Sequence, residues 1–228
     1  MIPWKLLDRA PVPGGEGELR LYQRGEEFSI RVTGHGELMN SRAHGSEDAL
    51  AALVCTRLAG RAQPRLLIGG LGMGFTLAVA LRELGPDAEV VVAELVPAVV
   101  AWNRGALGAQ AGNPLLDARA SVQEIDVARL LRSQRNAFDA ILLDVDNGPE
   151  GLTRDANDWL YSNGGLAAAF AALRADGILA VWSAGGDSDF TDRLRRAGFE
   201  AEEIRVRARM SKGARHTIWL ARRPGVSN

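Results

Sequence analysis

Short apolar runs alternate with longer amphipathic segments from residue 65 to residue 221. The runs are typical of strands that are buried on both faces of a parallel sheet, and they lie at 65–69, 89–93, 139–143 and 177–182. The segments have apolar residues at helical spacing, and they lie at 73–84, 97–105, 126–134, 166–174 and 187–197. This alternation predicts a doubly wound α/β sheet, which binds its ligands at the carboxyl ends of the strands.

The first forty residues follow a different pattern. Apolar and polar residues alternate at 19–22 and 28–32, on either side of Arg24-Gly25-Glu26, which predicts a β-hairpin. We therefore expect two parts: an N-terminal β-hairpin unit at 1–40 and a ligand-binding Rossmann-like domain at 41–228. The hairpin has edge strands, which are expected to allow pairing in a homodimer.

Composition excludes several classes of function. The net charge is −1 and the pI is near 6.3, so no general attraction to nucleic acid is expected. No apolar run approaches the ~18 residues that a membrane span needs, and the N-terminus lacks the apolar core of a signal peptide. The single cysteine, Cys55, excludes a disulfide framework, and no cluster of His, Cys and Asp has metal-ligand spacing. We expect a cytoplasmic protein without a bound metal.

A glycine-rich turn separates the strand at 65–69 from the next helix. Its glycines, Gly70, Gly72 and Gly74, allow positive φ angles and close approach of a ligand to the backbone, and the helix that follows favours an anion. A dinucleotide fingerprint would need glycine or alanine at Phe75. The observed spacing is instead common in class I enzymes that use S-adenosylmethionine (SAM).

Two acids follow the next strands of the predicted sheet. Glu94 ends the apolar run at 90–93, where one carboxylate can bind both hydroxyls of a ribose. Asp126 follows the short strand expected around Val122, where it can accept a hydrogen bond from an adenine amino group. Asp126 is equally suited to be the N-cap of the helix that follows it, and the two roles are compatible.

The strand at 139–143 is expected to deliver Asp144, and then Asp146, to the ligand crevice. Two carboxylates this close repel each other, so the pKa of one should rise, which suits a general base or an amine-binding group. For Asp146 a turn ahead of Gly148-Pro149 explains the sequence equally well.

Two further segments contain candidate substrate-binding residues. The connection at 144–165 is long enough to be a lid, and its Trp159 and Tyr161 either line a substrate pocket or pack in the core. The linker between the two parts contains Arg42, His44 and Glu47, which either face the pocket or form a surface turn. In this linker Ser46 is the expected N-cap of a helix.

These motifs resemble the spermidine synthase (polyamine aminopropyltransferase) family over roughly residues 28–185. LLIGGLGMG, VVVAE, EID and ILLDVDNGP stand in the family's order and at similar spacing. The resemblance implies a class I SAM-dependent methyltransferase fold. It also implies that Glu94 binds the ribose, that Asp126 binds the adenine, and that Asp144 is the catalytic or amine-binding acid.

The sequence departs from the family at the amine-binding positions. Gly72 replaces the family's aspartate in the glycine turn, and the Tyr-His-Glu motif is reduced to Ala43-His44-Gly45. The Asp-Ser-x-Asp-Pro motif has become DVDNGP, residues 144–149. A donor without a carboxylate should then be favoured less, whereas SAM is no longer repelled at position 72.

We therefore expect a SAM-dependent methyltransferase acting on a small molecule, with Asp144 or His44 orienting or deprotonating the acceptor. The catalytic rate would come mainly from alignment of the acceptor, methyl group and sulfur. Two alternatives remain: an aminopropyltransferase that uses decarboxylated SAM and a diamine, and a non-catalytic nucleoside-binding protein.

Overall fold

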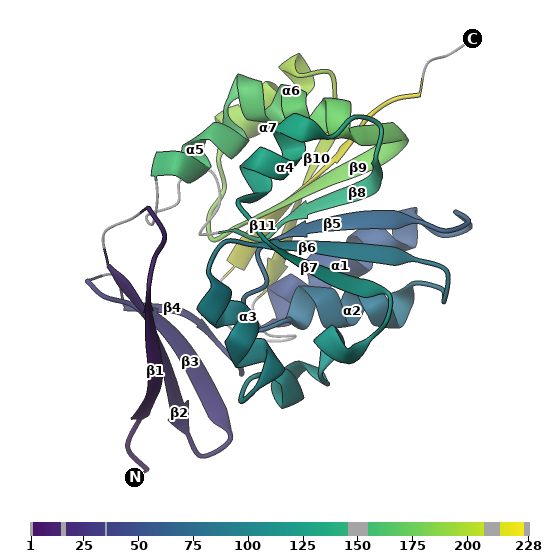
Figure 1. Ribbon diagram of the computed structural model, residues 1–228. Helices are drawn as coiled ribbons and strands as arrows, with labels where there is room; N and C mark the ends of the chain where they lie inside the picture. Colours follow the sequence, from purple (N-terminus) through teal and green to yellow (C-terminus); the bar gives the residue numbers. More distant parts are fainter. Residues whose placement is uncertain (1, 15–16, 35, 146–154, 208–214, 226–228) are drawn as a thin grey trace.

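The computed structural model describes residues 2–14, 17–34, 36–145, 155–207 and 215–225, which form two sheets and their covering helices (Figure 1). The strands are β1 (Lys5–Pro11), β2 (Glu18–Arg24), β3 (Glu27–Val32), β4 (Gly36–Asn40), β5 (Arg65–Gly69), β6 (Glu89–Glu94), β7 (Ala120–Glu124), β8 (Phe138–Leu143), β9 (Leu173–Ser183), β10 (Glu200–Arg207) and β11 (Arg215–Arg222). The helices are α1 (Gly45–Arg57), α2 (Phe75–Glu83), α3 (Pro97–Arg104), α4 (Val127–Ser133), α5 (Asp155–Tyr161), α6 (Asn163–Ala172) and α7 (Ser188–Arg196), with 3-10 turns η1 (Gly108–Ala111) and η2 (Pro114–Leu116).

The N-terminal part is an antiparallel sheet in the order β1-β2-β3-β4. The predicted hairpin is confirmed, because β2 and β3 pair up to Arg24 opposite Glu27. The first strand, β1, continues to Pro11, which pairs with Glu18 of β2. Proline fits there because β1 is an edge strand, where an N–H is not needed.

The main sheet has the order β10-β11-β9-β8-β5-β6-β7. Its strands from β9 to β7 are parallel, and β11 and β10 add an antiparallel hairpin at one edge. This is the predicted doubly wound α/β architecture. The order of the strands reverses between β5 and β8, and ligands of such sheets bind at this switch point.

Helices cover both faces of the main sheet, with α1, α2 and α3 on one face and α4 to α7 on the other (Figure 1). Along β5, Leu66 and Ile68 face the first layer and Leu67 faces the second, because successive side chains of a strand point to opposite faces. All three side chains are no more than 1% exposed. This double burial explains why the strands read as continuous apolar runs.

The prediction of a long loop at 144–165 is wrong in its second half, because α5 and the first turn of α6 lie there. Asn163-Gly164-Gly165 has the composition of a turn but begins α6, and Ser162 accepts a hydrogen bond from Gly165 N as its N-cap. A Cβ at Gly165 would lie 2.1 Å from the carbonyl oxygen of Trp159. Glycine at 165 therefore permits α5 and α6 to pack closely. The same composition, taken from the sequence alone, predicts a loop.

The N-terminal sheet packs against the helical layer of α1, α2 and α3. Apolar side chains of β2 and β3, such as Leu21 and Ile30, belong to the same buried cluster as that layer. Trp102 of α3 also donates a hydrogen bond to Asp8 of β1, with an Nε1 to Oδ2 distance of 2.7 Å. The predicted division near residue 40 therefore separates two sheets that share one core. Among the described helices, none has the length and apolar character needed to cross a bilayer.

Candidate active site

The glycine turn lies at the switch point and is packed between the ends of β6 and β8. Gly70 has φ +90°, and its N–H donates to the carbonyl of Ala93 at 2.9 Å. A Cβ on Gly70 would lie 2.4 Å from the carbonyl oxygen of Asp144. Only glycine satisfies both the positive φ and this contact. The turn therefore brings the backbone of one strand end directly against the next.

The other two glycines of the turn face different neighbours. Gly74 has φ +83° and is the residue before α2, whose first residue is Phe75. Gly72 has φ +53°, and a Cβ there would lie 3.1 Å from Sδ of Met39, a residue of the N-terminal sheet. The side-chain amide of Asn103, in α3, donates to the carbonyl oxygen of Gly72 at 2.8 Å and so helps to hold the turn in place.

Glu94 lies at the end of β6 and is only 7% exposed. Its Oε2 accepts from the N–H of Leu71 and its Oε1 from the N–H of Val96, both at 2.8 Å. Burial nevertheless raises the pKa of Glu94, against the effect of these backbone hydrogen bonds. Glu94 thus holds the glycine turn in place. Ribose binding by Glu94 stays a prediction.

Asp126 is the N-cap of α4, as predicted, because its Oδ1 accepts from the N–H of Ala128 at 2.8 Å. Among the described residues, no side chain or amide is bonded to its Oδ2. Two half-buried apolar side chains, Leu95 and Ile125, stand at the same strand ends as Glu94 and Asp126. Apolar walls beside a few polar groups suit a planar base. Sequence reasoning missed these two residues, whose only signal is their place next to the acids.

A small cavity of about 30 Å³ opens beside the glycine turn. Its walls come from β4, α1, the turn, the start of α2 and the end of β8, and they are Met39, Asn40, Glu47, Leu71, Gly72, Met73, Phe75, Thr76 and Asp144. The cavity brings together Glu47 and Asp144, which lie 97 residues apart in the sequence. Thr76 donates its hydroxyl proton to Oδ2 of Asp144 at 2.7 Å. Thr76 was not predicted, because it lies within an apolar helical pattern.

The two carboxylates of the cavity interact. Burial raises the pKa of Asp144 most, and the negative charge of Glu47 raises it further, to about 7. The hydrogen bond from Thr76 opposes this shift. Burial also raises the pKa of Glu47. The pair is therefore suited to hold a proton near neutrality, or to lower its energy by binding a cation.

Residues of the predicted linker have different positions. His44 stacks on Phe75, with ring centroids 4.0 Å apart, and its Nδ1 lies 2.9 Å from Oδ2 of Asp48. His44, not Ser46, is the N-cap residue of α1, so that prediction is wrong, because Ser46 bonds Glu47 instead. Arg42 is outside the cavity. Its exposed guanidinium lies 3.6 Å from Glu27 of the N-terminal sheet.

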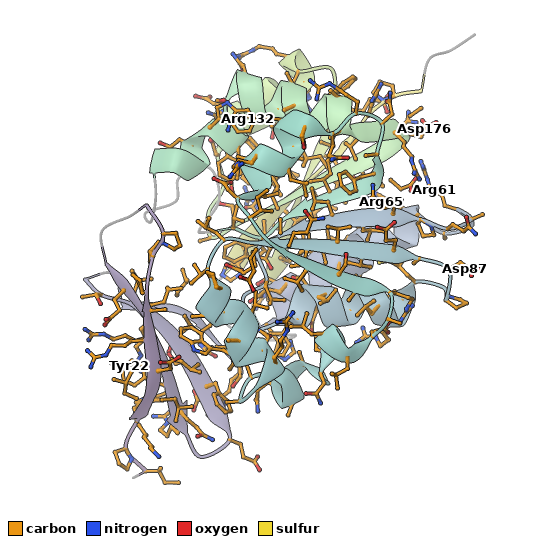
Figure 2. The ribbon with its side chains drawn as sticks, viewed as in Figure 1. Tyr22, Arg61, Arg65, Asp87, Arg132 and Asp176 are labelled. Carbon is orange, nitrogen blue, oxygen red and sulfur yellow. The ribbon has the colours of Figure 1, made fainter. Side chains whose placement is uncertain are left out.

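The aromatic candidates of the 144–165 segment pack away from the cavity. Tyr161 is 2% exposed, and its hydroxyl donates to the carbonyl of Val145 at 3.1 Å. The guanidinium of Arg132 lies over the ring of Trp159, 3.7 Å from the ring centroid. Figure 2 shows Arg132 in the layer of α4, away from the glycine turn. Both positions correspond to the core alternative. Asp146, the remaining candidate, is outside the described residues.

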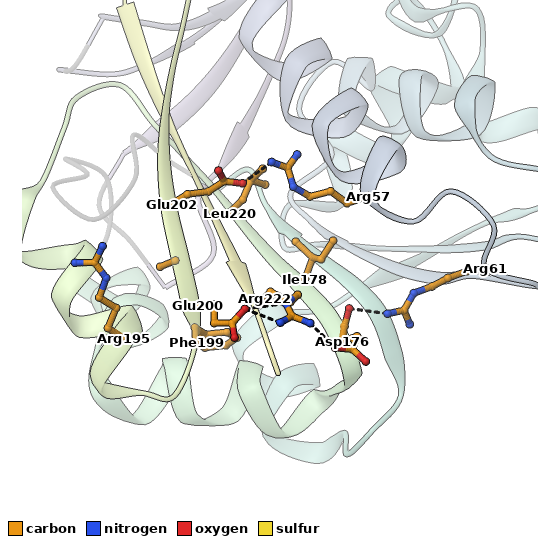
Figure 3. Close-up of a pocket in the computed structure, with 11 residues that line it drawn as sticks. Arg57, Arg61, Asp176, Ile178, Arg195, Phe199, Glu200, Glu202, Leu220 and Arg222 are labelled. Atoms are coloured by element: carbon orange, nitrogen blue, oxygen red, sulfur yellow. Dashed lines mark hydrogen bonds and ion pairs between the residues drawn. The ribbon is translucent and has the colours of Figure 1, made fainter. Parts of the chain in front are cut away.

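A larger cavity of about 760 Å³ lies at the amino ends of β9 and β10 (Figure 3). Its arginines are already bound: Arg57 to Glu202, and Arg222 to both Glu200 and Asp176. Ligands of doubly wound sheets bind at the opposite, carboxyl ends. The cavity at the glycine turn is therefore the candidate site. In the part of the chain that the structure describes, no group of three His, Cys, Asp or Glu side chains could hold a metal ion.

Three solved structures are similar to this chain over almost its whole length. Spermidine synthase from Thermotoga maritima has a TM-score of 0.75 and 16% identity, covering 98% of this chain and 74% of its own. A spermidine synthase in complex with the transition-state analogue AdoDATO has a TM-score of 0.74 and 17% identity, covering 98% and 73%. A probable spermidine synthase from Corynebacterium glutamicum has a TM-score of 0.64 and 16% identity, covering 96% and 79%.

No protein-family model matches the sequence, and neither does any curated protein. The structural similarity nevertheless covers 98% of this chain and so extends across both of its sheets. The chain has a spermidine synthase-like fold, with a Rossmann-like main sheet of the class I methyltransferase type.

Proposed function

We propose that this protein is an aminopropyltransferase, which uses decarboxylated SAM as donor and a small amine as acceptor. The observation that carries the proposal is the carboxylate pair of Glu47 and Asp144 beside the glycine turn. A decarboxylated donor ends in an ammonium group, and an amine acceptor is also a cation. Both are attracted by two half-buried carboxylates, whereas the carboxylate of intact SAM is repelled.

The other residues of the site fit the adenosyl part of such a donor. Glu94 would bind the ribose hydroxyls, and Oδ2 of Asp126 would accept from the adenine amino group. Leu95 and Ile125 would pack against the base. The cavity of about 30 Å³ is too small for the aminopropyl group, so the flexible side chain of Met39 must move aside.

In the proposed reaction, the lone pair of the acceptor nitrogen attacks the propyl carbon that is bonded to the sulfonium. The carbon–sulfur bond breaks and its electron pair returns to sulfur, which leaves neutral methylthioadenosine. The acceptor ammonium first gives up one proton, which Asp144 or Glu47 accepts, and this frees the lone pair of its nitrogen for the attack. An acid whose pKa is about 7 suits this general-base role at neutral pH.

Methyl transfer from SAM is the second candidate, and Gly72 is the observation that favours it. The turn has no acid at this position, so one source of repulsion against the SAM carboxylate is missing. We rank it second because the facing wall of the cavity presents Glu47 and Asp144.

Strands β1 and β4 are the edge strands of the N-terminal sheet. Pairing of such an edge with a second copy of the chain stays a prediction.

The proposal is tested by incubating the protein with decarboxylated SAM and a panel of diamines, and by measuring methylthioadenosine release. Turnover should depend on the diamine, and intact SAM should give none. Asp144→Asn and Glu47→Gln should each reduce kcat/KM by at least about tenfold, since each removes a charge that contacts the amine. Glu83→Gln, an exposed carboxylate at the far end of α2, is the matched control and should behave like the parent.

Other outcomes point to the other functions. Release of S-adenosylhomocysteine from SAM would favour methyl transfer. Tight binding of either donor without turnover on the amine panel would favour the non-catalytic nucleoside-binding protein.

A further inference from the structure

A chain of hydrogen bonds leads from the carboxylate pair to the C-terminal hairpin. The hydroxyl of Ser46 donates to Oε2 of Glu47 at 2.6 Å, and Oγ of Ser46 lies 2.8 Å from Nδ1 of His216. Ser46 and Glu47 belong to the first turn of α1, and His216 belongs to β11, 170 residues away. The contact therefore exists only because the fold brings the two elements together.

We propose that Ser46 and His216 form a proton relay, which carries the proton of the acceptor amine from Glu47 out of the cavity. This inference rests on the proposed aminopropyl transfer, in which every turnover leaves one proton on the carboxylate pair. A pair that kept this proton could not deprotonate the next acceptor. A path that empties the pair is therefore part of a complete catalytic cycle.

Ser46 has the position and chemistry that a relay needs. It is fully buried, so its proton partners are protein groups. Its hydroxyl does not cap α1, whose N-cap residue is His44 and whose N-terminal amides receive no side-chain hydrogen bond from that residue. A hydroxyl is both a donor and an acceptor, so it can pass on a proton in one step. While Glu47 is ionised, Ser46 donates to it and accepts from Nδ1–H of His216. Once Glu47 holds the proton and His216 is in its Nε2–H tautomer, Glu47 donates to Oγ of Ser46, and Ser46 donates its own proton to Nδ1. Transfer of both protons leaves Glu47 ionised and protonates both nitrogens of His216, which then releases the Nε2 proton to solvent.

His216 is suited to be the outer end of the relay. Histidine is the side chain whose ordinary pKa lies closest to neutral pH, so it can take up and release a proton there. The ring is only partly buried, and its edge packs on Trp182, with centroids 4.8 Å apart and planes at 71°. Nδ1 points to Ser46, which leaves Nε2 as the atom that returns the proton to solvent. Burial lowers the pKa of His216, which favours this release.

Four elements lie around His216: α1, β9, β10 and β11. From α1, Glu47 faces it through Ser46. On β10 its pairing partner is Val206, so Arg205 and Arg207 point to the opposite face of the sheet. On β9 the neighbouring side chain is that of Trp182, and on β11 itself Arg215 alternates to the other face. Glu47 is thus the charge that should dominate the titration of His216.

The relay is tested first by kinetics, with Ser46→Ala and His216→Asn. Asparagine places its amide nitrogen where Nδ1 lies, so it keeps the hydrogen bond to Ser46 but cannot transfer a proton. Both variants should lower kcat by at least about tenfold while KM for the amine changes by less than about threefold. In the parent, kcat should fall at acidic pH. The pH at which it falls should be shifted in both variants.

Ser29→Ala is the matched control, because Ser29 is equally buried and donates to Glu37 at 2.7 Å in the N-terminal sheet. It should lose a similar amount of stability without a change in the pH profile of kcat. If His216→Asn or Ser46→Ala retains the kcat and pH profile of the parent, the relay is excluded, even though aminopropyl transfer stands.

A second measurement does not depend on turnover. The ring protons of His216 can be titrated by NMR, and they are assigned with His216→Asn because the chain has three histidines. Glu47→Gln removes the neighbouring charge and should lower the pKa of His216 by about half a unit or more, but it should have no effect in a Ser46→Ala background. If Glu47→Gln leaves the titration unchanged, the relay is refuted. If the coupling is present but no amine is turned over, the relay holds and the proposed acceptor chemistry fails.

Discussion

Asp144→Asn should stabilise the free protein at pH 8. The carboxyl of Asp144 has its pKa raised to about 7, from 3.8 for an unperturbed aspartate, because it is buried and faces Glu47. Below about pH 4 the group is neutral in the folded and the unfolded chain, so it does not affect stability. Between about pH 4 and pH 7 only the unfolded chain ionises, and folding becomes progressively less favourable.

The size of the effect follows from the same two pKa values. A difference of about 3 units at 1.36 kcal/mol each gives a cost of about 4 kcal/mol once the pH exceeds 7. At pH 5 the cost is about 2 kcal/mol, so the parent should lose about 2 to 3 kcal/mol between pH 5 and pH 8. Asparagine has nearly the same shape and still accepts the Thr76 hydrogen bond, so the variant avoids this loss.

Urea unfolding of parent and variant at pH 5 and pH 8 measures the difference directly. The advantage of Asp144→Asn should grow between pH 5 and pH 8 by about 2 to 3 kcal/mol. If the variant is equally destabilised at both pH values, Asp144 ionises normally in the folded protein. The carboxylate pair would then lose the property on which the proposed amine binding depends.

Three further predictions concern the frame of the site. Gly70→Ala should lower the free energy of unfolding, measured with urea, by at least about 2 kcal/mol more than Gly60→Ala. Both residues have positive φ, but only at Gly70 would the new Cβ meet a carbonyl oxygen. Equal losses would contradict the close packing of the turn. Asp139→Ala should lower the free energy of unfolding by about 3 kcal/mol, because Arg61 and Arg174 both lose the buried carboxylate that they bind. A loss below about 1 kcal/mol would refute this. Glu94→Gln should weaken calorimetric binding of methylthioadenosine by at least about tenfold, since an amide cannot accept both backbone hydrogen bonds and the ribose; unchanged binding would remove Glu94 from the ribose site.

The main sheet could be predicted from the sequence because its strands and turns follow local rules. Leu66, Leu67 and Ile68 form a run that only a doubly covered strand explains, and Gly70 marks the sharp turn after it. Glycine at 165 has a different role, because it lies where α5 and α6 touch. That contact depends on packing between helices, and the local sequence gives no sign of it.

The candidate site was predictable in part for the same reason. Glu94, Asp126 and Asp144 follow strands directly, so their place at one edge of the sheet follows from the order of elements. Glu47 was a candidate only as a polar linker residue, and its pairing with Asp144 depends on how α1 packs. His216 had no signal at all, because its partner Ser46 is 170 residues away in the sequence.

The central claim is that the cavity at the glycine turn selects a donor that ends in an ammonium group. Isothermal titration calorimetry with decarboxylated SAM and with intact SAM, on the parent and on Glu47→Gln, tests it most directly. The account predicts that the parent binds the decarboxylated donor at least about tenfold more tightly, which is about 1.4 kcal/mol, and that Glu47→Gln reduces this preference. Equal or tighter binding of intact SAM by the parent would contradict it.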